Sequence, residues 1–254
     1  MHFSMARWFL AACMGAIIDL TTGGLLEVDL VFPRNETYPS DENMPIVFAF
    51  QHPENARYIQ PFISYKVFYL NEHGGPNNFL YTHYDLAWAD WTTVPNPYFV
   101  YKHWNKFNGK EGRWRLVWSL ETIHCSEDSF VNFSSPGLSY NVTSGYVEFT
   151  TEKSAPEIDL VASTANMSNC KEAGVVVDVG EKTLDVPAYV EWRGDRNAAK
   201  KCAVMAPPTA DPIEEPATDP CRVKIDSAIA QNIAASASSK AEQCNWLNPP
   251  PDCP

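Results

Sequence analysis

Apolar and polar side chains alternate along many short segments of this chain, and this spacing constrains the fold more than any other feature. Successive side chains of a strand point to opposite faces, so strict alternation predicts half-buried strands. Pro, Gly and Asn residues separate the segments, as turns require. We therefore expect an all-β protein, an antiparallel Ig-like β-sandwich. The expected strands are residues 26–32, 46–50, 64–70, 113–123, 145–151, 174–179 and 184–192.

In the C-terminal part of the chain, the apolar residues recur with a different period. Ile225, Ile229 and Ile233 recur at every fourth position, which predicts a helix after Cys221 with Pro220 near its first position. A straight helix from Cys221 to Cys244 would hold their Cα atoms roughly 35 Å apart, whereas a disulfide tolerates about 7 Å. We therefore expect each of these cysteines to pair with a different one, and the isoleucine stripe to pack on the sandwich.

The N-terminus has the layout of a secretory signal peptide, because Arg7 precedes an uncharged run over residues 8–18. This run is too short to span a bilayer. The expected organisation is a signal peptide over 1–23, a β-sandwich domain over 24–204, a Pro-rich linker or strap over 205–220, and a cysteine-anchored helix and tail over 221–254. After signal removal six cysteines remain, which suits three disulfides: Cys125, Cys170, Cys202, Cys221, Cys244 and Cys253.

Four N-x-[ST] sequons indicate N-glycosylation in an extracellular protein. Their acceptor residues are Asn35, Asn132, Asn141 and Asn166. None falls between residues 79 and 118. Together with the cysteines and the signal-like segment, they predict a secreted, glycosylated protein.

Charge and motifs narrow the possible partners. The formal net charge is −12 and the sequence pI is about 4.9, which disfavours nucleic acid and anionic membranes as partners. The sequence has no zinc-binding H-E-x-x-H, no hydrolase G-x-S-x-G and no dinucleotide-binding G-x-G-x-x-G motif. We therefore expect no metal and no other cofactor, and a monomer.

Aromatic and basic residues crowd together between residues 79 and 118. Trp114 and Trp118 follow the period of a strand and are expected in the core. The others lie in less regular sequence near Pro95 and Pro97, which favours a long exposed loop, although packing over the sandwich is the alternative. Flat rings can stack on sugars. The candidate ligand-binding residues are Trp88, Trp91, Tyr98, Tyr101 and Trp104.

The favoured function is thus a non-catalytic module that binds cell-wall or plant polysaccharide. One alternative is a carbohydrate-active enzyme, which would need two facing carboxylates. The carboxylates in the aromatic-rich region are Asp85, Asp90, Glu111 and Glu121. The other alternative is a structural or host-interacting secreted protein whose aromatic residues all lie in the core. His83 and His103 could also meet in space.

Four stretches of this chain are similar in sequence to a known protein family. They are LEVDLVFPRNETYPSDENMPIVFAFQHPENA, HCSEDSFVNFSSPG, VEFTT and DPCRVKIDSAIAQNIAAS. With them the chain resembles a group of secreted proteins of filamentous fungi that is catalogued only as a domain of unknown function. The resemblance covers nearly the whole mature chain and implies a fungal, extracellular protein. It implies no catalytic or binding residues.

Overall fold

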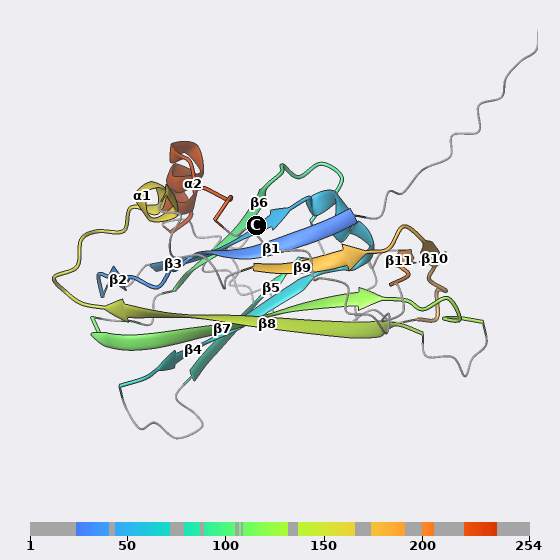
Figure 1. The fold of residues 1–254 in the computed structure, drawn as a ribbon, viewed down its shortest axis with the longest axis horizontal. Coiled ribbons are helices and arrows are strands. Elements are labelled where there is room, and N and C mark those ends of the chain that lie inside the picture. Colours follow the sequence, from blue (N-terminus) through green and yellow to red (C-terminus); the bar gives the residue numbers. More distant parts are fainter. Residues whose placement is uncertain are drawn as a thin grey trace, which may run out of the picture.

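The chain folds into two β-sheets that face each other, and two helices lie on the far side of one of them (Figure 1). The computed structural model describes residues 24–40, 44–71, 79–86, 89–104, 107, 109–131, 137–165, 174–190, 200–205 and 221–237. The expected signal peptide and nearly all of the Pro-rich linker lie outside these residues. In the described part, no helix is long and apolar enough to cross a membrane.

The first sheet has four antiparallel strands in the spatial order β6-β3-β1-β9. Val28 of β1 lies opposite Phe50 of β3 on one side and Val175 of β9 on the other. These side chains therefore point to the same face of the sheet. The strands are β1 (Gly24–Phe32), β3 (Met44–Gln51), β6 (Tyr98–Trp104) and β9 (Gly174–Val179).

The second sheet has five strands in the order β2-β8-β7-β4-β5, and only the short β2 runs parallel to its neighbour. The long β7 and β8 form its centre (Figure 1). Its strands are β2 (Thr37–Tyr38), β4 (Phe62–Tyr69), β5 (Phe79–Asp85), β7 (Gly112–His124) and β8 (Ser139–Thr151). The all-β fold class is thus confirmed, while the Ig-like type stays a prediction.

Aromatic side chains fill the space between the two sheets. Phe48 of β3 packs edge-on against Trp118 of β7, with ring centroids 5.4 Å apart. Tyr65 of β4 lies beside both Phe48 and Trp104. Trp118 is fully buried and Trp114 is 5% exposed, which confirms their predicted core positions. Such interlocking rings hold the sheets together through buried area and edge-to-face contacts.

The four-stranded sheet is also covered on its outer face. All eight residues of β3 are buried, which one-sided packing of an alternating strand cannot produce. Helix α1 (Leu160–Ala165), helix α2 (Ser227–Ala237) and the extended residues 221–226 form the cover, and Figure 1 shows both helices on the side away from β7 and β8. The predicted half-buried state of residues 26–32 is therefore wrong, since Glu27 and Asp29 are 7% and 0% exposed.

The C-terminal helix begins later than its isoleucine period predicts. It starts at Ser227, where the Asp226 carboxylate accepts the N–H of Ile229 at 2.8 Å and caps the helix. Pro220 is therefore not near its first position. Ile225 precedes the helix, yet Ile225 and Ile233 are both 1% exposed, so the predicted apolar stripe does pack on the sheet.

Three further parts of the chain differ from the sequence prediction. Residues 98–104 form the edge strand β6 and not a loop, because an edge strand tolerates prolines just before its first residue. Strand β5 was not predicted. Within the described residues 184–190 of the expected strand 184–192, only β10 (Thr183–Asp185) pairs, with β11 (Lys201–Ala203). A short 3-10 helix, η1 (Pro53–Tyr58), follows β3.

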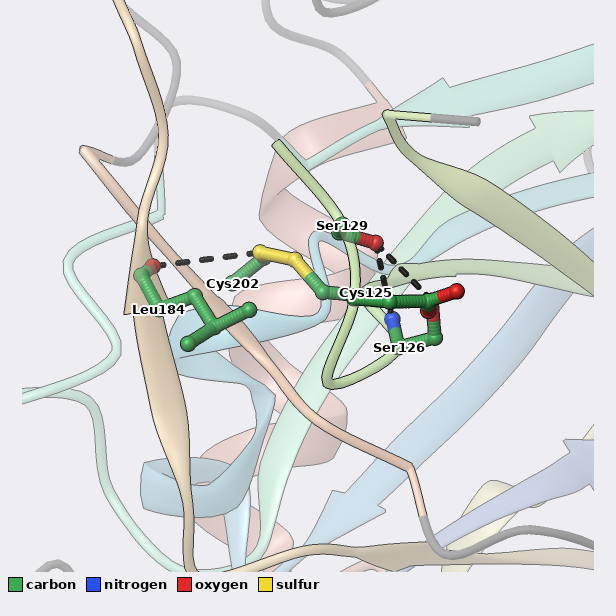
Figure 2. Close-up of a disulfide and its surroundings, with 6 residues drawn as sticks. Cys125, Ser126, Ser129, Leu184 and Cys202 are labelled. Atoms are coloured by element: carbon green, nitrogen blue, oxygen red, sulfur yellow. Dashed lines mark hydrogen bonds between the residues drawn. A yellow bond between two sulfur atoms is a disulfide. The ribbon is translucent and has the colours of Figure 1, made fainter. Parts of the chain in front are cut away.

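A disulfide joins Cys125, at the end of β7, to Cys202 in β11 (Figure 2). Both cysteines are fully buried in a second apolar cluster with Ile123 and Val204. Cys221 is disulfide-bonded as well, and its partner lies outside the described residues. Cys170, Cys244 and Cys253 also lie outside them, so the remaining connectivity stays a prediction.

The double variant Cys125→Ala/Cys202→Ala should lower the free energy of unfolding by about 4 kcal/mol, because the bridge closes a long loop in the unfolded chain. The two cysteines are 77 residues apart. Urea unfolding followed by tryptophan fluorescence measures this loss. An unchanged midpoint would show that the β10–β11 hairpin is held by its apolar contacts alone.

Candidate functional site

The structure places two of the five predicted ligand-binding residues in the core. Trp91 and Trp104 are 7% and 6% exposed, so their expected exposure on a long loop is wrong. Trp91 packs on Phe50 with ring centroids 5.3 Å apart. Trp104 of β6 lies opposite the buried Met44 of β3. Paired residues of neighbouring strands share a face of the sheet, so Trp104 points inward.

The two tyrosines of this group are only partly accessible. Tyr98 and Tyr101 are half-buried in β6, on opposite faces of the strand. Tyr98 lies edge-on to Trp91, and burial raises the pKa of its phenol. Trp88 lies outside the described residues. The predicted set therefore does not form one exposed surface.

Glu111 and Glu121, two of the carboxylates considered for catalysis, do not converge, whereas Asp85 and Glu121 both lie opposite Phe62 in the register. Asp90 caps a turn by accepting the N–H and hydroxyl of Thr92, and these hydrogen bonds lower its pKa. Glu111 and Glu121 stand before and within β7, roughly 30 Å apart along an extended strand, far beyond the separation that glycoside hydrolysis requires. The Asp85 side chain lies outside the described part. His83 and His103 lie on the outer faces of different sheets and do not meet.

The structure shows a different candidate surface on the outer side of the five-stranded sheet. Along residues 115–121 of β7, no described helix or strand covers this side, which lies below β7 and β8 in Figure 1; Ile123, at the end of β7, is buried in the cluster with Cys202. We call it the open face. It consists of Phe62, Ser64, Lys66 and Phe68 of β4, Tyr81 and His83 of β5, Arg115, Val117, Ser119 and Glu121 of β7, and Ser144, Tyr146 and Glu148 of β8. None of them is buried.

Aromatic rings occupy both sides of the open face. On β5, Tyr81 is 53% exposed, and its ring lies 6.1 Å from that of His83. His83 in turn stacks on Phe62 at 5.4 Å with an interplanar angle of 23°. On β8, Tyr146 is 52% exposed. These rings can therefore stack on a flat ligand without any change in the core.

Charged groups fix the Tyr146 ring in place. The Arg115 guanidinium lies 5.5 Å from its centroid, a cation–π contact. Glu148 binds Arg115 through the Arg115 Nε at 2.9 Å and Arg113 at 2.8 Å. The hydrogen bond from Arg115, with the charge of both arginines, holds the pKa of Glu148 below its usual value. The open face thus offers rings, hydroxyls and an oriented ion-pair group, a chemistry suited to binding.

Two of the four sequons have described acceptor residues. Asn35 and Asn141 are both exposed. Asn141 lies opposite Thr122, whose side chain is buried on the inner side of β7, so Asn141 points away from the open face. Asn132 and Asn166 lie outside the described residues.

A pocket of about 460 Å³ lies on the opposite side of the molecule, next to α2. Its lining is mainly apolar, with Pro45, Leu160, Ile233 and Ala237 among its residues. Three of its ten lining residues, His103, Asp159 and Gln231, carry hydrogen-bonding side chains, and the other seven are apolar.

The sequence contained part of the signal for the open face. The alternation along residues 113–123 correctly placed Arg113, Arg115, Ser119 and Glu121 opposite the tryptophans. Tyr81, His83 and Tyr146 also alternate with inward residues. They were not predicted as site residues, because the prediction favoured the tryptophans of the neighbouring segment, and Trp91 and Trp104 of that segment are buried.

The burial of Trp104 makes a direct prediction. Trp104→Ala should lower the free energy of unfolding by about 3–5 kcal/mol, because it removes a large core side chain. Tyr189→Ala is the matched control, since Tyr189 is 60% exposed and should leave stability within about 0.5 kcal/mol. Equal stability of the two variants in urea unfolding would show that Trp104 is not a core residue.

Comparison with known proteins gives a family without an assigned activity. No curated protein and no solved structure matches the chain. A family profile described as "Domain of unknown function (DUF7136)" matches residues 21–253. This match spans both sheets, the helices and the disulfide-linked hairpin. The chain therefore belongs to the DUF7136 family.

Proposed function

We propose that this protein is a secreted, glycosylated, non-catalytic module that binds a cell-wall or plant polysaccharide on the open face. The observation that carries the proposal is the pair of exposed tyrosines, Tyr81 and Tyr146, on an uncovered sheet. An aromatic ring gains by stacking on the apolar side of a sugar, while neighbouring polar groups bind its hydroxyls. The fungal, extracellular origin implied by the resemblance fits this role.

The register of the sheet sets the two tyrosines in one cross-strand row. Tyr146 lies opposite Val117, Val117 opposite Lys66, and Lys66 opposite Tyr81. Three interstrand spacings separate the two tyrosine Cα atoms, a distance of about 14 Å. A short stretch of an extended sugar chain lying across the strands would reach both rings.

The next row of the open face supplies hydrogen-bonding groups. Ser144, Ser119, Ser64 and His83 follow one another across the same four strands. The hydroxyl oxygens of Ser119 and Ser144 are 2.8 Å apart. A ligand stacked on the tyrosine row would present its hydroxyls to this serine row, which favours a carbohydrate over a purely apolar ligand.

The competing enzyme function has less support. Glycoside hydrolysis needs two carboxyl groups that a substrate can reach. Glu27 and Asp29 do lie on one face of β1, but they are 7% and 0% exposed beneath residues 221–226. Binding on the open face requires no such group.

The test is binding to a panel of insoluble and soluble polysaccharides by pull-down and affinity electrophoresis. Tyr81→Ala and Tyr146→Ala should each weaken binding about tenfold, because each removes one stacking ring worth about 1.4 kcal/mol. The double variant should show no measurable retention. Both side chains are exposed, so the thermal unfolding midpoint should stay unchanged.

Tyr189→Ala serves as the matched control, because Tyr189 is equally exposed but lies outside the open face. It should bind like the wild type. Failure of the wild type to bind any polysaccharide, or full binding by the double variant, would contradict the proposal. Release of soluble sugar from any substrate would favour the enzyme instead.

A further inference from the structure

Three polar side chains are buried on the covered face of the four-stranded sheet. Glu27 and Asp29 of β1 and Gln51 of β3 are 7%, 0% and 6% exposed. Glu27 lies directly opposite Gln51 in the register, and Asp29 is the next residue of β1 on that face. Two carboxyl groups therefore share one nearly dry site, where two negative charges are costly.

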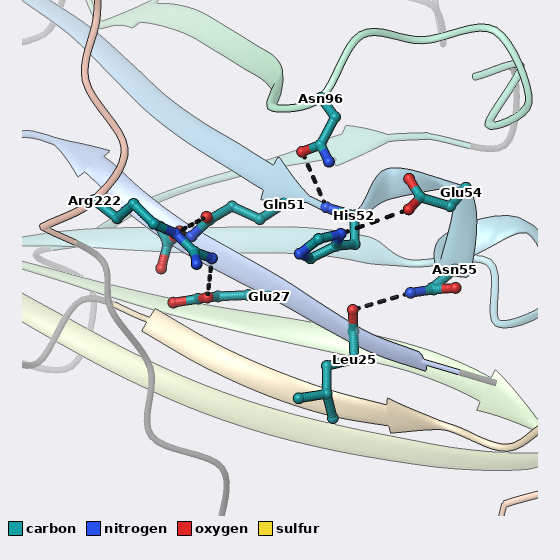
Figure 3. A network of polar contacts seen from close by, with 9 residues as sticks. Leu25, Glu27, Gln51, His52, Glu54, Asn55, Asn96 and Arg222 are labelled. Carbon is teal, nitrogen blue, oxygen red and sulfur yellow. Dashed lines mark hydrogen bonds and ion pairs between the residues drawn. The ribbon is translucent and has the colours of Figure 1, made fainter. Parts of the chain in front are cut away.

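A chain of hydrogen bonds connects this cluster to the C-terminal segment (Figure 3). Gln51 Nε2 donates to Asp29 Oδ2 at 2.7 Å. Arg222 Nε donates to Gln51 Oε1 at 2.8 Å, and the same guanidinium lies 3.3 Å from Glu27 Oε2. Asp29 Oδ1 is buried and has no hydrogen-bond partner.

Residues 221–226 lie over the cluster. We call this segment the strap, and from here on the name does not include the Pro-rich residues 205–220. Val223 and Ile225 of the strap are 4% and 1% exposed. The N–H of Ile225 donates to Thr164 Oγ1 of α1 at 3.0 Å, while Cys221 is disulfide-bonded. The strap is thus attached at both ends, and Arg222 near its start binds Gln51 and Glu27 beside Asp29.

We propose that the strap is an acid-closed latch, which lies tightly over β1 and β3 while Asp29 keeps its proton and opens progressively as the pH rises. Opening admits water to the Asp29 carboxylate and relieves its repulsion by Glu27. The covered face of β1 and β3 then becomes accessible in neutral and alkaline medium. The open face lies on the other sheet, so the latch is independent of ligand binding there.

The electrostatics of the site give the direction of the effect. Burial, followed by the charge of Glu27, raises the pKa of Asp29 from 3.8 to about 8. The Gln51 hydrogen bond and the charge of Arg34 lower the pKa of Asp29, while Arg222 of the strap contacts Glu27. On the third side, β9 places Gly174 and Val176 beside Asp29 and Glu27, and neither titrates.

The sign follows from linkage. Because the closed-state pKa of Asp29 lies above its ordinary value, the proton stabilises the closed state. This stabilisation is complete below about pH 4, decreases as the pH rises toward 8, and is gone above the closed-state pKa. Opening should therefore become more frequent between pH 4 and pH 8 and level off above that range.

Hydrogen–deuterium exchange with mass spectrometry on the full chain tests the latch. After correction for intrinsic exchange, peptides covering 221–237 should lose at least about tenfold protection between pH 5 and pH 8. Peptides from β7 should keep theirs over the same range. Equal loss in both regions would mean a global effect and would overturn the latch.

Asp29→Asn should abolish the pH dependence, because the neutral amide can still accept from Gln51 and never ionises. Asp178→Asn is the matched control, since Asp178 is an exposed carboxylate on the neighbouring β9 and should leave the pH profile unchanged. A wild-type profile in Asp29→Asn would contradict the proposal.

A second measurement does not depend on the variant folding. Carboxyl ¹³C NMR of the wild type should show Asp29 titrating well above its ordinary value. A pKa below 5 for Asp29 would overturn the latch, whatever the exchange data show.

Discussion

The burial of β1 and β3 on both faces determines the rest of the architecture. Their inner face meets the five-stranded sheet, where Phe48 packs on Trp118. Their outer face is covered by the strap, α1 and α2. The C-terminal isoleucines are buried because they belong to this cover. Asp29 is buried because the cover lies over it. Since the covering elements all lie on the four-stranded sheet, the five-stranded sheet keeps one face uncovered, and that face carries the exposed rings.

Residues that alternate on a one-sided strand were predictable. The period along β7 placed its tryptophans inside and its arginines outside, because only one face of this strand is packed. The same rule failed for β1. Glu27 and Asp29 read as solvent-facing residues, but they are buried under a cover that includes the strap, a segment almost 200 residues away. No local pattern contains that contact.

The predicted exposure of Trp91 and Trp104 was wrong for a related reason. Trp91 and Trp104 lie among prolines and asparagines, which favour loops, yet β6 completes the edge of the four-stranded sheet and turns Trp104 inward. Large aromatic residues gain most by burial, so their number near a turn says little about exposure. The weaker signal of Tyr81 and Tyr146 marks the accessible surface, because alternation in β5 and β8 places them on the outer face of the sheet.

The molecule therefore presents one covered and one uncovered sheet, and the central claim is that the uncovered sheet holds the ligand. Hydroxyl-radical footprinting with mass spectrometry, with and without a bound polysaccharide, tests this claim most directly. We expect rapid modification of Tyr81 and Tyr146 in the free protein, protection of both in the complex, and unchanged modification of Tyr189. Protection elsewhere while Tyr81 and Tyr146 stay reactive would contradict the account.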